Sequence, residues 1–283
     1  GGALLAYGIV NMTNVTIENN DGVNGGGLDS DDSDIEIKNS IISGNTAENL
    51  GGGANFLDGI VNMTNVIIEN NDGRKGGGLL FQNSDIEIKN STISGNTAEN
   101  LGGGAVFGVD TINMTNVTIE NNYTDGDGGG AYFQNGIANI TNVTIENNAG
   151  RNGGGLFSSY SDIEINNSII SGNTSEQNGG GICNLDSYLI LKNTLITQNT
   201  SRIGGGIIAD SSTNIMINVV VADNISEVNG SAIYSYGVFP IILNSIIWNN
   251  TPQQNSIDEI WLNPYINFSN IDDTTNFSYV TSI

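Results

Sequence analysis

The glycine triplet GGG returns along this chain at a nearly fixed interval. Its eight full copies begin at Gly25, Gly51, Gly76, Gly102, Gly128, Gly153, Gly179 and Gly204. A degenerate copy, GSA, begins at Gly230, and the chain opens on GGA, the remains of another copy in which Gly1 holds offset 1. Successive copies are 25 or 26 residues apart, so the chain holds ten related units. A period of this length is typical of a repeat architecture, in which each unit packs on its neighbours.

Four columns are constant when the units are aligned with the first triplet glycine as offset 0. Offset 12 is always apolar, offset 17 is always isoleucine or valine, and offset 20 is always asparagine, from Asn20 and Asn45 to Asn250. Offset 14 is also asparagine in all ten units: Asn14, Asn39, Asn65, Asn90, Asn116, Asn142, Asn167, Asn193, Asn218 and Asn244. Such regularity argues against the disorder that the glycine, asparagine and serine content would otherwise suggest.

The apolar residues within a unit alternate with polar ones. In DIEIKN, at 34–39, Ile35 and Ile37 alternate with Glu36 and Lys38, which is the period of a β-strand. Helical repeats need longer amphipathic segments, and the spaced leucines of leucine-rich repeats are missing. The sequence therefore predicts an all-β fold, a right-handed single-stranded parallel β-helix or solenoid of about ten coils, with three short strands in each coil.

The two asparagine columns fit this prediction as structural ladders. Equivalent residues of stacked coils lie about 4.8 Å apart, so each side-chain amide can donate to the oxygen of the next. Asparagine also tolerates the left-handed backbone of a sharp corner, and the glycine triplet suits a further corner. We therefore expect the asparagines to hold corners, with no catalytic role.

The repeat pattern ends near residue 255. We predict one elongated domain, with the repeat array at 1–255. Residues 256–283 carry no glycine triplet, and we expect an irregular terminal coil or cap there, or the lead-in to a following domain. Because the chain begins inside a unit, we also expect a targeting segment outside this sequence.

The charge of the chain limits its partners. It has 30 acidic and 7 basic residues, for a net charge of −23. Nucleic acid and anionic membranes are poor partners for such a surface. No apolar run approaches the roughly 18 residues of a membrane span, so we expect no membrane insertion by this segment. Cys183 is the single cysteine, which predicts a structural thiol and no internal disulfide.

Few residues suggest chemistry. Histidine is absent, which excludes Ser-His-Asp and Cys-His nucleophile systems and histidine-bound zinc. The densest acidic group is LDSDDSD, whose Asp29, Asp31, Asp32 and Asp34 could bind Ca²⁺, the single cofactor that we consider. The alternative interpretation is a solvated turn between coils. A polysaccharide lyase or glycoside hydrolase is the alternative function. The sequence provides no specific support for it, because no acidic cluster unique to one unit accompanies the basic residues.

Three motifs carry a resemblance to a known family. They are the GGG[AL] starts, SxISGNTA at 40–47 and 91–98, and NSIIWNNTP at 244–252. The chain resembles the parallel β-helix repeats of bacterial polymorphic outer-membrane proteins, whose GGA[ILV] motif is matched by GGAL at 1–4 and whose FxxN motif is approached by FQN at 81–83 and 133–135. The resemblance spans about residues 1–272. It implies a secreted or surface-displayed protein and transfers no catalytic residue.

These observations together predict a structural or adhesive β-helix. We expect a secreted or cell-surface stalk, adhesin passenger or fibre element that presents a long repetitive face to a glycan or a cell-surface protein. End-to-end self-association into a filament is a further alternative, since the strand edges of a terminal coil can pair with another subunit.

Overall fold

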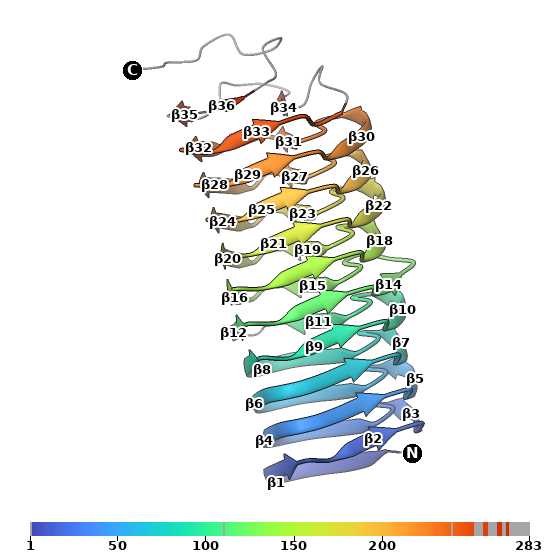
Figure 1. Cartoon of the computed structure of the whole chain (residues 1–283). Helices are drawn as coiled ribbons and strands as arrows, with labels where there is room; N and C mark the ends of the chain where they lie inside the picture. The colour runs from blue at the N-terminus through green and yellow to red at the C-terminus, as the bar shows by residue number, and fades with distance from the viewer. Residues whose placement is uncertain are drawn as a thin grey trace.

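The chain winds into coils that stack along one axis. The computed structural model describes residues 2–109, 111–238, 240–251, 257–259, 265–267 and 270–271. In these ranges every regular element is a β-strand, and the coils follow one another from the N-terminal to the C-terminal end (Figure 1). The strand pairings are parallel. The described residues contain no helix with the length and hydropathy of a membrane span.

The strands fall into four rows, each with one strand position per coil. Row one, at offsets 3–6, begins in β1 (Ala3–Thr13), β4 (Leu28–Ser43), β6 (Ala54–Glu69) and β8 (Leu79–Lys89), long strands that bend into the following rows. It continues in β11 (Ala105–Gly108), β15 (Ala131–Gln134), β19 (Leu156–Ser159), β23 (Ile182–Leu185), β27 (Ile207–Asp210), β31 (Ile233–Tyr236) and β34 (Ile257–Glu259).

Rows two and three complete the same 27-stranded sheet. Row two, at offsets 9–13, runs through the long strands and then through β12 (Thr111–Thr115), β16 (Ile137–Thr141), β20 (Asp162–Asn166), β24 (Tyr188–Lys192), β28 (Thr213–Ile217), β32 (Ile241–Leu243) and β35 (Tyr265–Asn267). Row three, at offsets 16–18, has β2 (Thr16–Glu18), β9 (Thr92–Ser94), β13 (Thr118–Glu120), β17 (Thr144–Glu146), β21 (Ile169–Ser171), β25 (Leu195–Thr197), β29 (Val220–Ala222), β33 (Ile246–Trp248) and β36 (Asn270–Ile271).

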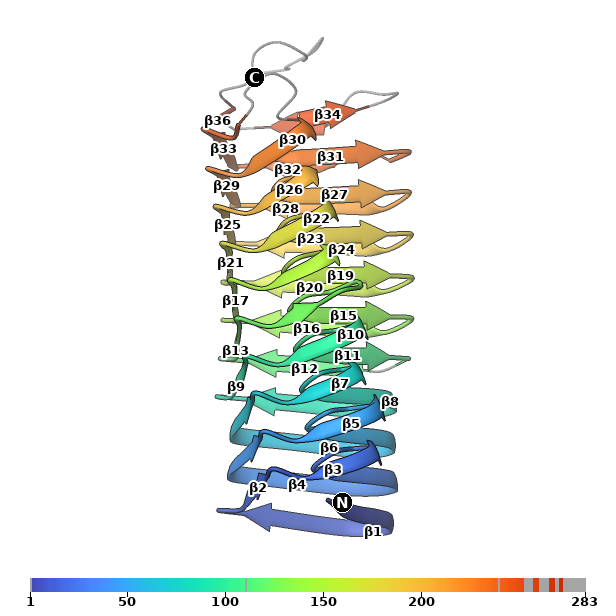
Figure 2. The same cartoon turned by 90° about the vertical axis from the view of Figure 1, so that its right-hand side faces the viewer.

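Row four is a separate nine-stranded sheet, which faces the viewer in Figure 2. It consists of β3 (Asp21–Asn24), β5 (Thr46–Leu50), β7 (Asp72–Lys75), β10 (Thr97–Leu101), β14 (Tyr123–Thr124), β18 (Ala149–Asn152), β22 (Thr174–Asn178), β26 (Thr200–Ile203) and β30 (Ile225–Asn229). Each coil thus has four strand positions. The prediction of three strands per coil was wrong.

Four left-handed corners separate these rows. The backbone has positive φ at the triplet glycine of offset 0 and at offsets 7, 14 and 19. The offset 7 corner separates rows one and two, and its residues share no side-chain type: Tyr7, Asp32, Asp58, Asn83, Val109, Asn135, Tyr160, Asp186, Ser211 and Gly237. Because this corner repeats in backbone conformation alone, the sequence pattern did not reveal it.

The glycine triplet holds the coils close together. A Cβ on Gly52 would lie 2.3 Å from the carbonyl oxygen of Gly77, and one on Gly77 would lie 2.4 Å from that of Gly103. Real Cβ atoms do not approach backbone oxygen this closely, so a side chain at Gly52 or Gly77 would push the neighbouring coil away. The degenerate copy near the end of the array carries Ser231 at the equivalent position. The recurring glycines are therefore explained by coil stacking.

Inward side chains fill the axis of the helix. The constant apolar columns are buried, as at Met63 and Ile68, which are both 0% exposed. Row one adds a stack of four phenylalanine rings, whose neighbouring centroids lie 4.8 to 5.3 Å apart: Phe56, Phe81, Phe107 and Phe133. A second apolar cluster contains Cys183, and burial raises the pKa of its thiol well above the ordinary value. The predicted structural thiol is consistent with this position.

The offset 20 asparagines form a buried ladder through the described coils. In the middle of the array, Asn96 donates its backbone N–H and its side-chain Nδ2 to Asn122 Oδ1, both at 3.0 Å. Asn122 repeats both bonds to Asn148 Oδ1, and its Nδ2 also donates to the Ile93 carbonyl at 2.9 Å. Each rung thus pairs polar groups that would otherwise be buried without partners.

The C-terminal segment continues the stack. Strands β34, β35 and β36 pair with β31, β32 and β33, so the backbone begins a further coil after residue 255. The predicted cap or lead-in at 256–283 lies mainly outside the described residues.

Candidate functional site

The offset 14 asparagines lie at an exposed corner between rows two and three. All ten have positive φ, from Asn14 at 57° to Asn244 at 50°. Their side chains bond between coils, for example Asn65 Nδ2 to Asn39 Oδ1 at 3.0 Å and Asn116 Nδ2 to Asn90 Oδ1 at 3.0 Å. Side-chain hydrogen bonds between asparagines of neighbouring coils, as the ladder prediction requires, join six of the nine junctions at this corner.

The four aspartates considered for Ca²⁺ are spread around another corner. Asp29 lies on row one and accepts from Asn55 Nδ2 at 2.7 Å. Asp32 occupies the left-handed corner at φ 46°, Asp31 precedes it, and Asp34 opens row two, where it accepts from the Ile60 N–H at 3.1 Å. No group of three or more aspartate, glutamate, histidine or cysteine residues suited to a metal ion occurs in the described part of the chain. The structure does not bring these carboxylates together as one ligand set.

Lysines and glutamates are paired along the outward face of row two. Lys38 binds Glu36 at 2.6 Å and Lys89 binds Glu87 at 2.7 Å, in each case within one strand. The third pair crosses between neighbouring coils, with Lys192 Nζ 2.7 Å from Glu164 Oε1. Each of these lysines lies at offset 13 and each glutamate at offset 11. The lysines therefore neutralise acids of offset 11, and the acids of offset 9 have no lysine as counter-ion in the described coils.

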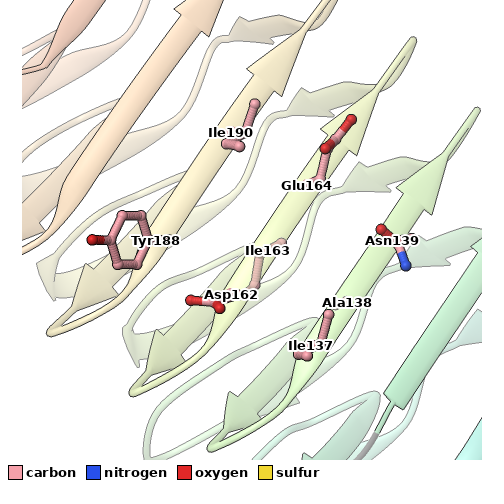
Figure 3. Close-up of a pocket in the computed structure, with 8 residues that line it drawn as sticks. All are labelled: Ile137, Ala138, Asn139, Asp162, Ile163, Glu164, Tyr188 and Ile190. Atoms are coloured by element: carbon pink, nitrogen blue, oxygen red, sulfur yellow. The ribbon is translucent and has the colours of Figure 1, made fainter.

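A groove lies on this face where β16, β20 and β24 run side by side (Figure 3). Its volume is about 300 Å³, at the lower end of the range for small-ligand sites. Two lines of outward side chains cross it. The strand register places Ile137, Asp162 and Tyr188 in one line and Asn139, Glu164 and Ile190 in the next.

The first line presents a carboxylate between two apolar side chains. Tyr188 is 57% exposed and Ile137 is 53% exposed. Asp162 lies between them on the middle strand (Figure 3), and its carboxylate has no hydrogen-bond or ion-pair partner among the described residues. This line therefore offers an unpaired negative charge with an aromatic ring on one side and an aliphatic side chain on the other.

The second line is already satisfied internally. Glu164 Oε1 accepts from Lys192 Nζ at 2.7 Å and from Asn166 Nδ2 at 3.0 Å. The bond from Lys192, and then that from Asn166, holds the pKa of Glu164 below its ordinary value. Asn139 Nδ2 donates to Asn113 Oδ1 at 3.2 Å. Glu164 is therefore an ionised, anchored side chain and a poor proton donor.

This arrangement suits binding better than acid–base chemistry. A glycosidase pair needs one carboxyl whose environment keeps it protonated, and Glu164 is held in the opposite state. What the groove offers is apolar contact on both sides of the Asp162 carboxylate, on an open outward face.

Sequence reasoning did not find this groove. Offset 9 reads as a variable column, in which Ile137, Asp162 and Tyr188 are three unlike residues. The available signal was Tyr188, the one tyrosine at offset 9, next to an acid in the preceding unit. That signal gains meaning only when the exposed face and the strand register are known.

Comparison with known families places this architecture. A family model described as "Right handed beta helix region" matches residues 4–156. The chain belongs to the right-handed β-helix family. The predicted fold class is thereby confirmed, and the coils of this β-helix beyond residue 156 keep the same four rows. Searches of curated proteins and of solved structures gave no match to this β-helix. The closer resemblance to polymorphic outer-membrane proteins stays a prediction.

Proposed function

We propose that this β-helix is a structural and adhesive rod of a secreted or cell-surface protein, serving as a stalk or adhesin passenger. The observation that carries the proposal is that outward positions of successive coils line up in register along the strand rows. Ten coils at about 4.8 Å each give a repetitive face roughly 45 Å long. Such a face suits multiple weak contacts along a partner.

The outward face changes chemistry along the rod, which supports a role in recognition. Row two presents asparagine, threonine, glutamate and lysine in the N-terminal coils, such as Asn62 and Glu87. In the last three coils more of its outward positions are aliphatic, at Ile190, Ile215, Ile217, Ile241 and Leu243, beside Tyr188, Lys192 and Thr213. A partner lying along the rod would meet a polar, acidic surface first and a more apolar one next.

An attachment assay tests the adhesive role. Beads coated with the purified chain are expected to attach to cell surfaces or extracellular matrix more strongly than beads coated with an acidic protein of similar net charge. Equal attachment of both kinds of bead would contradict the proposal. End-to-end association stays a prediction, and small-angle scattering over a range of concentrations tests it, since stacked rods lengthen without a change in cross-section.

An enzyme acting on glycans is the second candidate, because Asp162 and Glu164 lie two residues apart in the groove. It predicts release of reducing or unsaturated sugar ends from a glycan panel, with and without Ca²⁺. Turnover that is lost in Asp162→Ala and kept in Asp31→Ala would replace the adhesive proposal with this one. We expect no turnover, because Lys192 keeps Glu164 ionised.

A further inference from the structure

The offset 9 line carries exposed acids whose charge is not neutralised locally. Asp85 and Asp162 are exposed at this offset, and neither carboxylate has a hydrogen-bond or ion-pair partner in the described ranges. Every lysine of row two is already bound to a glutamate of the adjacent offset 11 line. A ligand that approaches offset 9 therefore meets negative charge without first displacing an internal cation.

Apolar side chains share the offset 9 line with these acids. From one coil to the next the line runs Ile60, Asp85, Thr111, Ile137, Asp162 and Tyr188, and its three apolar members are 45%, 53% and 57% exposed. The groove lies where two of them flank Asp162 in successive coils. The line thus offers both acidic and apolar contacts over several coils, which are about 4.8 Å apart.

A cation on an apolar stem matches this chemistry. The guanidinium of an arginine can pair with the Asp162 carboxylate while its methylene stem packs on Ile137 and its plane stacks on the Tyr188 ring. A neutral sugar would cover the carboxylate without supplying a counter-charge, which is costly. The net charge of −23 attracts basic partners at long range and repels acidic ones.

We propose that the offset 9 face, centred on the groove of Asp162 and Tyr188, binds an extended basic segment of a partner protein. The occupant follows from charge complementarity and from the presence of both acids and apolar side chains over several coils, which exceeds the reach of a small cation. This inference rests on the proposed adhesive function and names its partner class.

Fluorescence anisotropy with labelled tetra-arginine tests the proposal. We expect saturable binding that weakens steeply as NaCl rises from about 50 to about 300 mM, since ion pairing is screened. Asp162→Asn combined with Tyr188→Ala should weaken binding by about tenfold or more, the loss of roughly one charge-assisted contact. Tyr188→Phe should bind as the unchanged chain does, because the ring is kept.

Glu176→Gln is the matched control. Glu176 lies in the same coil as Asp162 but on β22 of row four, and it is exposed, so the substitution removes the same charge from another face. It should change binding by less than about twofold. In each variant, the backbone amides of the substituted coils should exchange hydrogen at the same rate as in the unchanged chain. Weaker peptide binding can then be assigned to the lost contact and not to unfolding of the coil.

Three outcomes would overturn the inference. They are no binding of tetra-arginine, equal weakening by Glu176→Gln and by the groove variant, and tighter, salt-independent binding of the neutral oligosaccharide cellohexaose to the same groove. The bead attachment assay is independent of the peptide. If coated beads attach to cells but the chain does not bind tetra-arginine, the proposal of a basic partner is refuted and the adhesive role stands. If the chain binds tetra-arginine but its beads attach no better than the control beads, the adhesive role is refuted.

Discussion

Replacing Asn122 by leucine removes one rung of the buried asparagine ladder and keeps the branched shape of the side chain, with two methyl groups in place of the amide oxygen and nitrogen. In the folded protein Asn122 Oδ1 accepts from both the backbone N–H and the Nδ2 of Asn96 at 3.0 Å. Leucine offers no acceptor, so these two buried donors lose their partner. The Ile93 carbonyl also loses the bond from Asn122 Nδ2.

The cost follows from the number of groups left without partners. Each buried donor that loses its acceptor costs about 1–3 kcal/mol, so the two donors of Asn96 together cost about 2–6 kcal/mol. We expect the free energy of unfolding to fall by this amount in urea denaturation. Because stacked coils can open locally, hydrogen exchange should accelerate most at the amides of the coils on either side of Asn122.

Asn116→Gly is the control in the same coil. Asn116 lies at the exposed corner with φ 55°, its Nδ2 donates to Asn90 Oδ1 at 3.0 Å, and its Oδ1 accepts from Asn142 Nδ2 at 3.3 Å. Glycine keeps the left-handed backbone, and water replaces the two lost bonds at this exposed corner, so we expect a cost of at most about 1 kcal/mol. The explanation of the buried ladder is refuted if Asn122→Leu destabilises the protein no more than Asn116→Gly does.

Three other substitutions test the core, a corner and an ion pair. Phe107→Ala removes the ring between Phe81 and Phe133 and should lower the free energy of unfolding by about 3–5 kcal/mol in urea denaturation. Tyr160→Asn places a residue that favours the left-handed backbone at a corner with φ 50°, and should raise the free energy of unfolding by about 1 kcal/mol in the same assay. Lys192→Met should return the pKa of Glu164 toward its ordinary value of 4.5 in an NMR titration. Because the folded pKa is lowered, the Lys192 contact stabilises the protein above that value and ceases to do so as the pH falls through the folded pKa.

Each of these tests has an outcome that contradicts its reasoning. A Phe107→Ala protein as stable as the original would mean that the ring stack contributes little. A destabilised Tyr160→Asn protein would show that the exposed tyrosine makes contacts that outweigh its backbone strain. An unchanged Glu164 titration after Lys192→Met would assign the lowered pKa to Asn166 alone.

The inward half of this fold could be predicted from the sequence, because inward positions constrain the side chain. Met63 and Ile68 occupy columns that are apolar in every unit, and both are fully buried. The buried asparagines of offset 20 recur because each side chain bonds to its copy in the next coil. Those of offset 14 are exposed, and they recur at a left-handed corner that asparagine tolerates. Because equivalent side chains of successive coils contact one another, such positions appear in the aligned units as constant columns.

Outward positions could not be predicted in the same way, because solvent accepts almost any side chain there. Val109 and Tyr160 share a left-handed corner, although their side chains have nothing in common. The groove depends on which unlike residues three successive coils place at offset 9, so it leaves no constant column. The aspartates at 29–34 are close in the sequence, but the corner at Asp32 divides them between rows one and two, and they form no metal-binding group in the part of the chain that the structure describes.

The four corners and the constant columns make the coils interchangeable, and this has a genetic consequence. The stretches NMTNVTIENN at 11–20 and NMTNVIIENN at 62–71 differ at one residue and are 51 residues apart. Recombination between the DNA segments that encode them would delete or duplicate two coils. The chain would then be rejoined at equivalent positions of the repeat, and the buried asparagine ladder would continue across the junction. Molecules of different length could therefore arise in a single event, with no loss of folding at the junction.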